Sequence, residues 1–181
     1  MKYFIASDIH GSYKYASVIC ERFKAEKADK LLILGDILYH GPRNDLPDGY
    51  APKKVIELLN SIKNDIIAVR GNCEAEVDSM VLDFPCMSAY AVVMTETGRC
   101  IYMTHGHIFN PENLPPLADG SIFLYGHTHV KVLDKSNNIY IMNPGSVSIP
   151  KDGKASYGIY ENGKLYLKDL DGNIISEKDV I

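Results

Sequence analysis

The chain has 181 residues, of which 46% are hydrophobic and 23% charged, and its formal net charge at pH 7 is −4. This length and composition are typical of one globular unit, so we expect a single domain over residues 1–181. No apolar run approaches the ~20 residues that cross a bilayer. No basic run indicates a general affinity for nucleic acid. These properties exclude a membrane-spanning protein and disfavour a nucleic-acid-binding one.

The amino terminus and the cysteines both favour a cytoplasmic protein. The first residues lead directly into a polar motif at Asp8, with no room for a signal peptide before it. The cysteines show no C-x-x-C pair and no zinc-finger spacing, and a chain of this length does not need disulfides to fold. They are Cys20, Cys73, Cys86 and Cys100.

The first half of the chain alternates predicted strands and helices. Apolar runs predict strands over residues 2–6, 31–34 and 66–69. Helical spacing of apolar residues predicts a helix over 13–27, and Pro52 suits the first turn of a second helix.

The second half is rich in predicted strands, at 89–94, 99–104, 122–125, 139–142, 157–160, 165–167 and near 174–175. Turn residues at 95–98 and 161–163 predict two hairpins. A βαβαβ start followed mostly by strands predicts an α/β fold, with two packed mixed β-sheets flanked by helices.

Polar clusters that combine oxygen or imidazole donors with glycine follow several of these strands. Because open α/β sheets bind ligands at the carboxyl ends of their strands, we expect the clusters to converge. Two aspartates, an asparagine and four histidines at one place predict a site for two divalent metal ions, and hence a metal-dependent phosphoesterase. The clusters are Asp8-Ile9-His10, Gly35-Asp36, Gly71-Asn72, His105-Gly106-His107 and Gly126-His127-Thr128-His129.

The order D-x-H, G-D, G-N, H-G-H and G-H-T-H resembles that of the calcineurin-like metallophosphoesterases. Residues 35–44, 70–74 and 143–150 further resemble a subgroup, the small bacterial YfcE-type phosphodiesterases, and the resemblance extends to about Tyr160. It implies a complete set of metal ligands: Asp8, His10 and His129 at one ion, Asn72, His105 and His127 at the other, and Asp36 bridging both.

The resemblance also implies the chemistry. Two ions ~3.5–4 Å apart clamp a phosphoryl group and lower the pKa of a bridging water towards ~7, so that a metal-bridging hydroxide attacks phosphorus. Oxygen and imidazole ligands with one bridging carboxylate suit transition metals better than Mg²⁺ or Ca²⁺. The resemblance favours Mn²⁺, with Zn²⁺, Fe²⁺, Co²⁺ and Ni²⁺ as alternatives.

Three other residues are candidates for a direct part in the reaction. His107 either acts in the pocket or hydrogen-bonds a metal ligand. Arg43 and Asn44, on the Gly/Pro-rich loop after Asp36, either meet a substrate phosphate or belong to a solvated loop. The segment from Asn143 to Ser146 is expected to turn and pack beneath the site.

Cys73 departs from the family pattern, because most of the wider family has a histidine there that protonates the leaving group. A thiol of ordinary pKa ~8.5 is a poorer proton donor near neutrality than imidazolium. We therefore expect a modest enzyme that prefers aryl to alkyl esters, since general acid help is worth ~10²–10⁴ in rate. The alternative is that Cys73 is merely a small residue tolerated beside the metals.

These features predict a dimetal-dependent phosphodiesterase that hydrolyses small phosphodiesters. A phosphomonoesterase or a dinucleoside polyphosphate hydrolase with the same metals is the nearest alternative, disfavoured because few cations beyond Arg43 and Arg70 are available for a dianion. A protein-binding scaffold of the retromer-subunit type is the other, disfavoured because all seven expected ligands are present. The resemblance also suggests a homo-oligomer.

Overall fold

The computed structural model describes residues 1–180, and its first sheet has six strands. β1 pairs in parallel with β2, and β2 with β3, whereas β9, β10 and β11 run antiparallel to their neighbours. The spatial order is β11 (Ile174–Asp179), β10 (Lys164–Asp169), β9 (Ser156–Glu161), β1 (Lys2–Ala6), β2 (Lys30–Ile33) and β3 (Ile66–Ala68).

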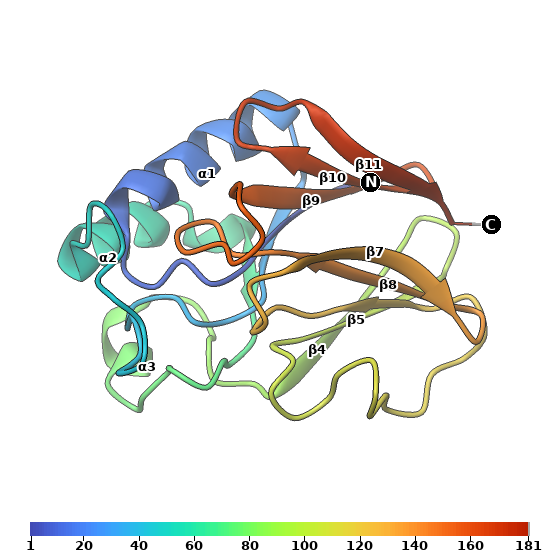
Figure 1. Cartoon of the computed structure of the whole chain (residues 1–181), viewed down its shortest axis with the longest axis horizontal. Helices are drawn as coiled ribbons and strands as arrows, with labels where there is room; N and C mark the ends of the chain where they lie inside the picture. Colours follow the sequence, from blue (N-terminus) through green and yellow to red (C-terminus); the bar gives the residue numbers. More distant parts are fainter. Residues whose placement is uncertain (181) are drawn as a thin grey trace.

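The second sheet has five strands and faces the first (Figure 1). β5, β6 and β8 are parallel, and the edge strands β4 and β7 are antiparallel to their neighbours. The spatial order is β4 (Tyr90–Met94), β5 (Cys100–Thr104), β6 (Ile122–Leu124), β8 (Ile139–Pro144) and β7 (Lys131–Ser136).

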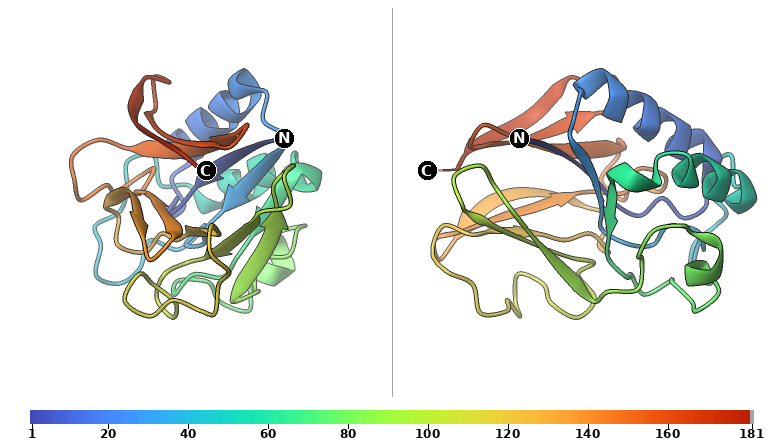
Figure 2. Two further views of the ribbon diagram at one scale, coloured as in Figure 1. Left: turned by 90° about the vertical axis from the view of Figure 1, so that its right-hand side faces the viewer. Right: turned by 180° about the vertical axis from the view of Figure 1, so that it is seen from behind.

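Helices α1 (Tyr13–Glu26) and α2 (Pro52–Asn60) lie on the side of the six-stranded sheet that is turned away from the second sheet (Figures 1 and 2). The Ser12 side chain caps α1 by accepting a hydrogen bond from a backbone N–H of its first turn, and Pro52 begins α2. A 3-10 turn (Lys63–Asp65) and a short helix, α3 (Asp78–Val81), complete the elements.

Alternation along β1 divides the core into two layers. Phe4 and Ala6 pack towards the helices, in a cluster with Ile19 and Leu59, whereas Ile5 packs between the two sheets. A third cluster, which includes Phe123, lies on the outer face of the five-stranded sheet, where Phe109, Leu114 and Leu117 of the long connection after β5 pack against it. Both faces of both sheets are therefore buried around the parallel strands.

The predicted fold class, two packed mixed sheets with helices outside, is confirmed. The two hairpins form where predicted, with turns between β4 and β5 and between β9 and β10. The prediction was wrong in omitting β7 and α3. Among residues 1–180, no helix is long and apolar enough to cross a membrane.

Candidate metal centre

The strand ends bring all seven expected metal ligands to one place. β1 leads to Asp8 and His10, β2 to Asp36, and β3 to Asn72, while β5 and β6 of the second sheet supply the other three histidines. Backbone hydrogen bonds tie these loops together, from Asp8 N to Gly35 O (3.2 Å) and from His10 N to Asp36 O (2.9 Å). The centre therefore lies where the parallel strands of both sheets end.

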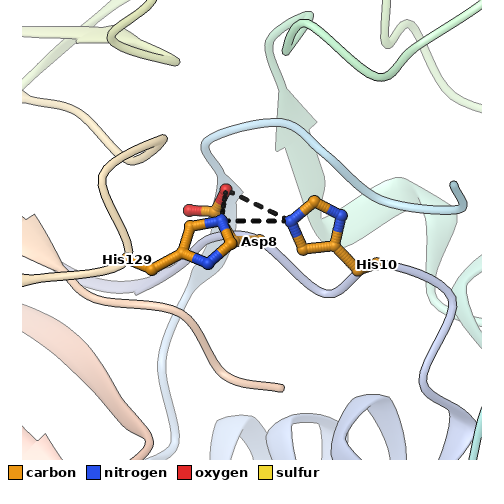
Figure 3. A group of neighbouring side chains, drawn as sticks. All are labelled: Asp8, His10 and His129. Atoms are coloured by element: carbon orange, nitrogen blue, oxygen red, sulfur yellow. Dashed lines mark hydrogen bonds and ion pairs between the residues drawn. The ribbon is translucent and has the colours of Figure 1, made fainter. Parts of the chain in front are cut away.

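Asp8, His10 and His129 form the first cluster of donors, and their side chains point towards one another (Figure 3). Asp8 Oδ1 lies 3.2 Å from His129 Nε2 and 3.7 Å from His10 Nε2. The two Nε2 atoms are 3.2 Å apart. All three residues are buried, so few water molecules can reach these atoms.

Asp36, Asn72 and His105 form the second cluster, with the His127 ring beside it. His105 Nε2 lies 3.1 Å from Asn72 Oδ1 and 3.4 Å from Asp36 Oδ2. The His105 and His127 ring centroids are 5.1 Å apart. Asp36 Oδ2 is also 3.7 Å from His10 Nε2, so this carboxylate lies between the two clusters.

Backbone carbonyl groups orient three of these histidines. A carbonyl oxygen only accepts hydrogen bonds, so an Nδ1 in contact with one carries a proton, and Nε2 is the ring nitrogen left to bind a metal. The three contacts are His10 Nδ1 to Tyr39 O (2.7 Å), His105 Nδ1 to Leu34 O (2.6 Å) and His129 Nδ1 to Ile149 O (3.0 Å). Each of these rings thus presents a potential ligand atom to the centre.

Hydrogen-bond donors hold the two aspartates. Asp8 Oδ2 accepts hydrogen bonds from Ser7 Oγ (2.6 Å) and His127 N (3.1 Å), whereas Asp8 Oδ1 is buried without a hydrogen-bond partner. Asp36 Oδ1 accepts from Cys73 N (2.8 Å), and Oδ2 faces the histidines. One oxygen of each carboxylate is left to bind a cation, so the donor set fits divalent metal ions.

The electrostatics of the centre also suit divalent cations. Burial opposes ionisation of Asp8 and Asp36, but the neighbouring histidines outweigh it and lower the pKa of both carboxyl groups. Burial lowers the pKa of His10 and favours the neutral ring that binds metals. Burial also acts on His105, but Asp36 and Asp8 outweigh it and raise its pKa to about 9. A bound divalent ion would replace that proton as the positive partner.

The backbone at the centre adopts a conformation that is rare outside glycine. A positive φ in a residue with a side chain costs ~1–3 kcal/mol and is concentrated at functional sites. Five of the seven expected ligands have one: Asp8 (57°), His10 (50°), Asp36 (54°), His127 (66°) and His129 (61°). Packing at the strand ends keeps these residues in a conformation that directs their side chains inward.

Glu74 holds the backbone of two loops at the centre, and the sequence interpretation missed this role. Its buried carboxylate accepts hydrogen bonds from the backbone N–H groups of Asp36 (3.0 Å), Ile37 (2.6 Å) and Gly71. Burial, reinforced by the charge of Asp36, raises the Glu74 pKa to about 7. A Cβ atom at Gly71 would collide with both the Asp36 and Glu74 carboxylates, so only glycine fits there.

The end of β8 and the segment after it lie beneath the centre. Asn143 and Pro144, which the sequence predicted to lie in a turn, are the last two residues of β8. Ser146 Oγ and Ser148 Oγ donate hydrogen bonds to the Asp8 carbonyl oxygen, at 2.8 and 3.0 Å. Asn143 Nδ2 donates to Gly126 O (2.8 Å), which holds the loop that carries His127. These contacts hold the backbone at Asp8 and in the loop that carries His127.

A hollow of about 570 Å³ opens over the two clusters, and Arg43, Asn44 and Cys73 line it together with His10 and Asp36. The structure thus brings three of the four predicted catalytic residues to the mouth of the centre. It does not bring His107 into this hollow; His107 lines a neighbouring one.

Lys151 and Thr128 also line the main hollow, and the sequence interpretation missed both. Lys151 is held near the centre because its backbone N donates to His129 O (3.0 Å). The only sequence signal for Lys151 was its position directly after the 143–150 motif.

Cys73 lies beside Asp36, where burial and the negative charge of that carboxylate make the thiol a weaker acid. Its Sγ accepts a hydrogen bond from Asn72 Nδ2 (3.3 Å). Burial, together with the negative charge of Asp36, raises the pKa of the thiol well above its usual range. The protonated thiol is therefore a poor proton donor at neutral pH.

Comparison with known proteins places this geometry in a family. A model of the calcineurin-like phosphoesterase superfamily domain matches residues 1–164. The chain belongs to this superfamily. Phosphodiesterase YfcE from Escherichia coli K12 is 50% identical over 179 residues, which are 98% of this chain and 97% of that protein. The family expected from the sequence, a metal-dependent phosphoesterase, is confirmed.

Solved structures agree with the superfamily fold. The structure of the E. coli phosphoesterase YfcE matches with a TM-score of 0.97 and 48% identity over 100% of both chains. Vps29 from Entamoeba histolytica matches over 100% of both chains with a TM-score of 0.64, but at 17% identity this likeness shows the fold alone.

Proposed function

We propose that the protein is a dimetal-dependent phosphodiesterase that hydrolyses small phosphodiesters. One observation carries the proposal: two clusters of oxygen and imidazole donors share Asp36, and the lone pairs of His10 and His129 face each other at 3.2 Å. Two lone-pair nitrogens in contact repel each other unless a cation lies between them. Asp8, His10 and His129 would hold one ion, Asn72, His105 and His127 the other, and Asp36 both.

The chain's own residues position the ions and the substrate. When bound, two divalent ions would activate a water molecule and neutralise the charge that develops on the phosphate. Arg43 and Asn44 lie at the mouth of the centre, where the guanidinium fork would contact a non-bridging phosphate oxygen. Cys73 would give the leaving group little general acid help, so good leaving groups should react fastest.

The 50% identity to a phosphodiesterase favours a diester as substrate. A phosphomonoesterase remains the second candidate, and one observation favours it: Lys151 adds a cation to the hollow beyond Arg43. Completeness of the metal ligand set favours an enzyme over a scaffold.

Further properties are proposed on the same basis. Mn²⁺ is the metal that we propose, since the donor set suits transition metals. We also propose that residues 1–181 form one domain and act in the cytoplasm as a homo-oligomer.

Comparative kinetics test the substrate class. Metal-stripped protein is loaded with Mn²⁺ and assayed on bis-p-nitrophenyl phosphate, p-nitrophenyl phosphate and a diadenosine polyphosphate. We expect kcat/KM for the diester to exceed that for each of the others at least ~10-fold, a difference of ~1.4 kcal/mol in transition-state stabilisation. A preference for the monoester would assign the enzyme to the phosphomonoesterases instead.

A further inference from the structure

A second hollow, of about 330 Å³, adjoins the metal centre. Asn72 lines both this hollow and the larger one, so the two meet at an expected metal ligand. The His107 ring lines the second hollow, and its centroid is 5.4 Å from that of His105 and 6.2 Å from that of His127. A group bound in the second hollow would therefore lie within one small substrate's length of the metal ions.

The walls of the second hollow differ in character from those of the first. Met87, Ala89 and Ile108 give it an apolar surface, and Ile108 is 49% exposed although it lies beside a polar centre. By contrast, the larger hollow has the cations Arg43 and Lys151 at its mouth. Exposed apolar side chains next to a reaction centre are typical of a surface that a ligand covers.

Arg70 gives the second hollow a planar cation. Its guanidinium makes one long hydrogen bond, from Nη2 to Glu74 O at 3.5 Å, and within residues 1–180 no carboxylate pairs with it. A guanidinium plane stacks on aromatic rings, and a methionine thioether packs favourably against them. Arg70 and Met87 together therefore suit a flat aromatic group better than an alkyl chain.

A phosphodiester carries two substituents on one phosphorus atom, and two hollows meet at Asn72, an expected metal ligand. We propose that the second hollow is a subsite for the ester substituent that stays on phosphorus and that it selects an aromatic or similarly flat group. The larger hollow then receives the other, more polar substituent. This subsite rests on the proposed diesterase function and deepens it by naming a substrate class, diesters with at least one aromatic group.

The first test uses two diesters with the same leaving group. Bis-p-nitrophenyl phosphate and methyl p-nitrophenyl phosphate both release nitrophenolate, so the ratio of their kcat/KM values reports the second substituent. We expect Ile108→Ala and Met87→Ala to lower this aryl-over-methyl ratio ~3–10-fold, chiefly through KM. Val92→Ala is the matched control, because Val92 is also 49% exposed but lines neither hollow, and it should leave the ratio unchanged.

The second test measures binding without turnover. Phenylphosphonate and methylphosphonate have no cleavable ester bond, and calorimetry on the Mn²⁺-loaded protein gives their Kd values. We expect the phenyl compound to bind more tightly and Ile108→Ala to remove most of that preference. An unchanged preference in both Ile108→Ala and Met87→Ala would overturn the subsite. If the parent protein hydrolyses neither diester, the diesterase function fails, and the phosphonate measurement still decides the subsite.

Discussion

The Nε2 atoms of His10 and His129 lie 3.2 Å apart, although 119 residues separate the two histidines in the chain. Each ring is held from behind by a hydrogen bond from Nδ1 to a backbone carbonyl group, so two lone pairs face each other beside the unpartnered Oδ1 of Asp8. A bound cation would turn this repulsive arrangement into a favourable one. The stability of the protein should therefore depend on divalent metal.

We predict that Mn²⁺ raises the melting temperature of metal-stripped protein. A ligand that binds only the folded state stabilises it by ~2.7 kcal/mol at 100 times its Kd. For a chain of this size, that corresponds to about 5–10 °C. Differential scanning calorimetry with and without Mn²⁺ gives the shift.

The same substitution at two histidines checks which of them binds the metal. His129→Gln should remove most of the Mn²⁺-induced shift, whereas His40→Gln should retain it, because His40 is not among the expected ligands. Equal shifts in the two variants would contradict the assignment of His129.

Glu74→Gln should weaken metal binding although it replaces none of the expected metal ligands. The glutamate accepts hydrogen bonds from three backbone N–H groups in the loops that carry Asp36 and Asn72, and an amide cannot accept all of them. We expect the Mn²⁺ concentration needed for half-maximal activity to rise ~10–100-fold, as for other groups that orient metal ligands.

Glu76→Gln is the control for this change, because Glu76 is exposed and lies only two residues further along the chain. It should behave like the parent protein. If Glu74→Gln required no more Mn²⁺ than Glu76→Gln, the supporting role of Glu74 would be refuted.

Cys73→His should raise the activity on alkyl phosphodiesters. The histidine would lie beside Asp36 at the mouth of the centre and could protonate a poor leaving group, which the neutral thiol does weakly. We expect a gain of ~10-fold or more in kcat on an alkyl diester and a smaller gain on a nitrophenyl diester. Equal or lower activity in a folded, metal-loaded variant would show that Cys73 is only a tolerated small residue.

The ion pairs of Glu26 predict a pH-dependent part of the stability, away from the metal centre. Burial opposes ionisation of Glu26, but hydrogen bonds from Lys168 (2.6 Å), Lys2 (2.8 Å) and Tyr157 (2.8 Å) outweigh it and lower its pKa to about 2. Because the folded pKa lies below the ordinary value of 4.5, this stabilisation is present above pH 4.5. It is lost as the pH falls from there towards about 2.

Glu26→Gln should therefore destabilise the protein by ~1–2 kcal/mol at pH 7, and the difference from the parent should shrink below pH ~4.5. Urea unfolding of metal-stripped protein at pH 7, 5, 4 and 3.5 measures it. Glu177→Gln, in an exposed pair with Lys164, is the control and should cost less than ~0.5 kcal/mol. A constant difference at all four pH values would refute the linkage.

The sequence predicted the parts of the fold that depend on local pattern. The strand that ends before Asp8 and the hairpin around Gly163 follow from apolar runs and turn residues within a few positions. β7 was missed because Lys131–Ser136 is an edge strand with a weak pattern: its second half is exposed and carries two charged residues.

The same distinction applies to the centre. Donor residues next to glycine were visible in the sequence. The role of Glu74 was not, because it depends on the backbone N–H groups of Asp36 and Ile37, which lie 38 and 37 residues away. The Lys151 position and the hollow beside Ile108 likewise arise from loops that meet only in the folded chain. No periodicity or spacing in the sequence predicts such contacts between distant loops.

The most direct test of a dimetal phosphodiesterase is hydrolysis of bis-p-nitrophenyl phosphate by metal-stripped protein, before and after Mn²⁺ is added, with Asp36→Asn measured in parallel. We expect turnover that appears with Mn²⁺ and falls by a factor of ~10² or more in the variant, because an amide cannot supply the charge of a bridging carboxylate. No turnover of the parent with Mn²⁺, Zn²⁺, Co²⁺ or Ni²⁺, or equal turnover of Asp36→Asn, would contradict a dimetal phosphodiesterase.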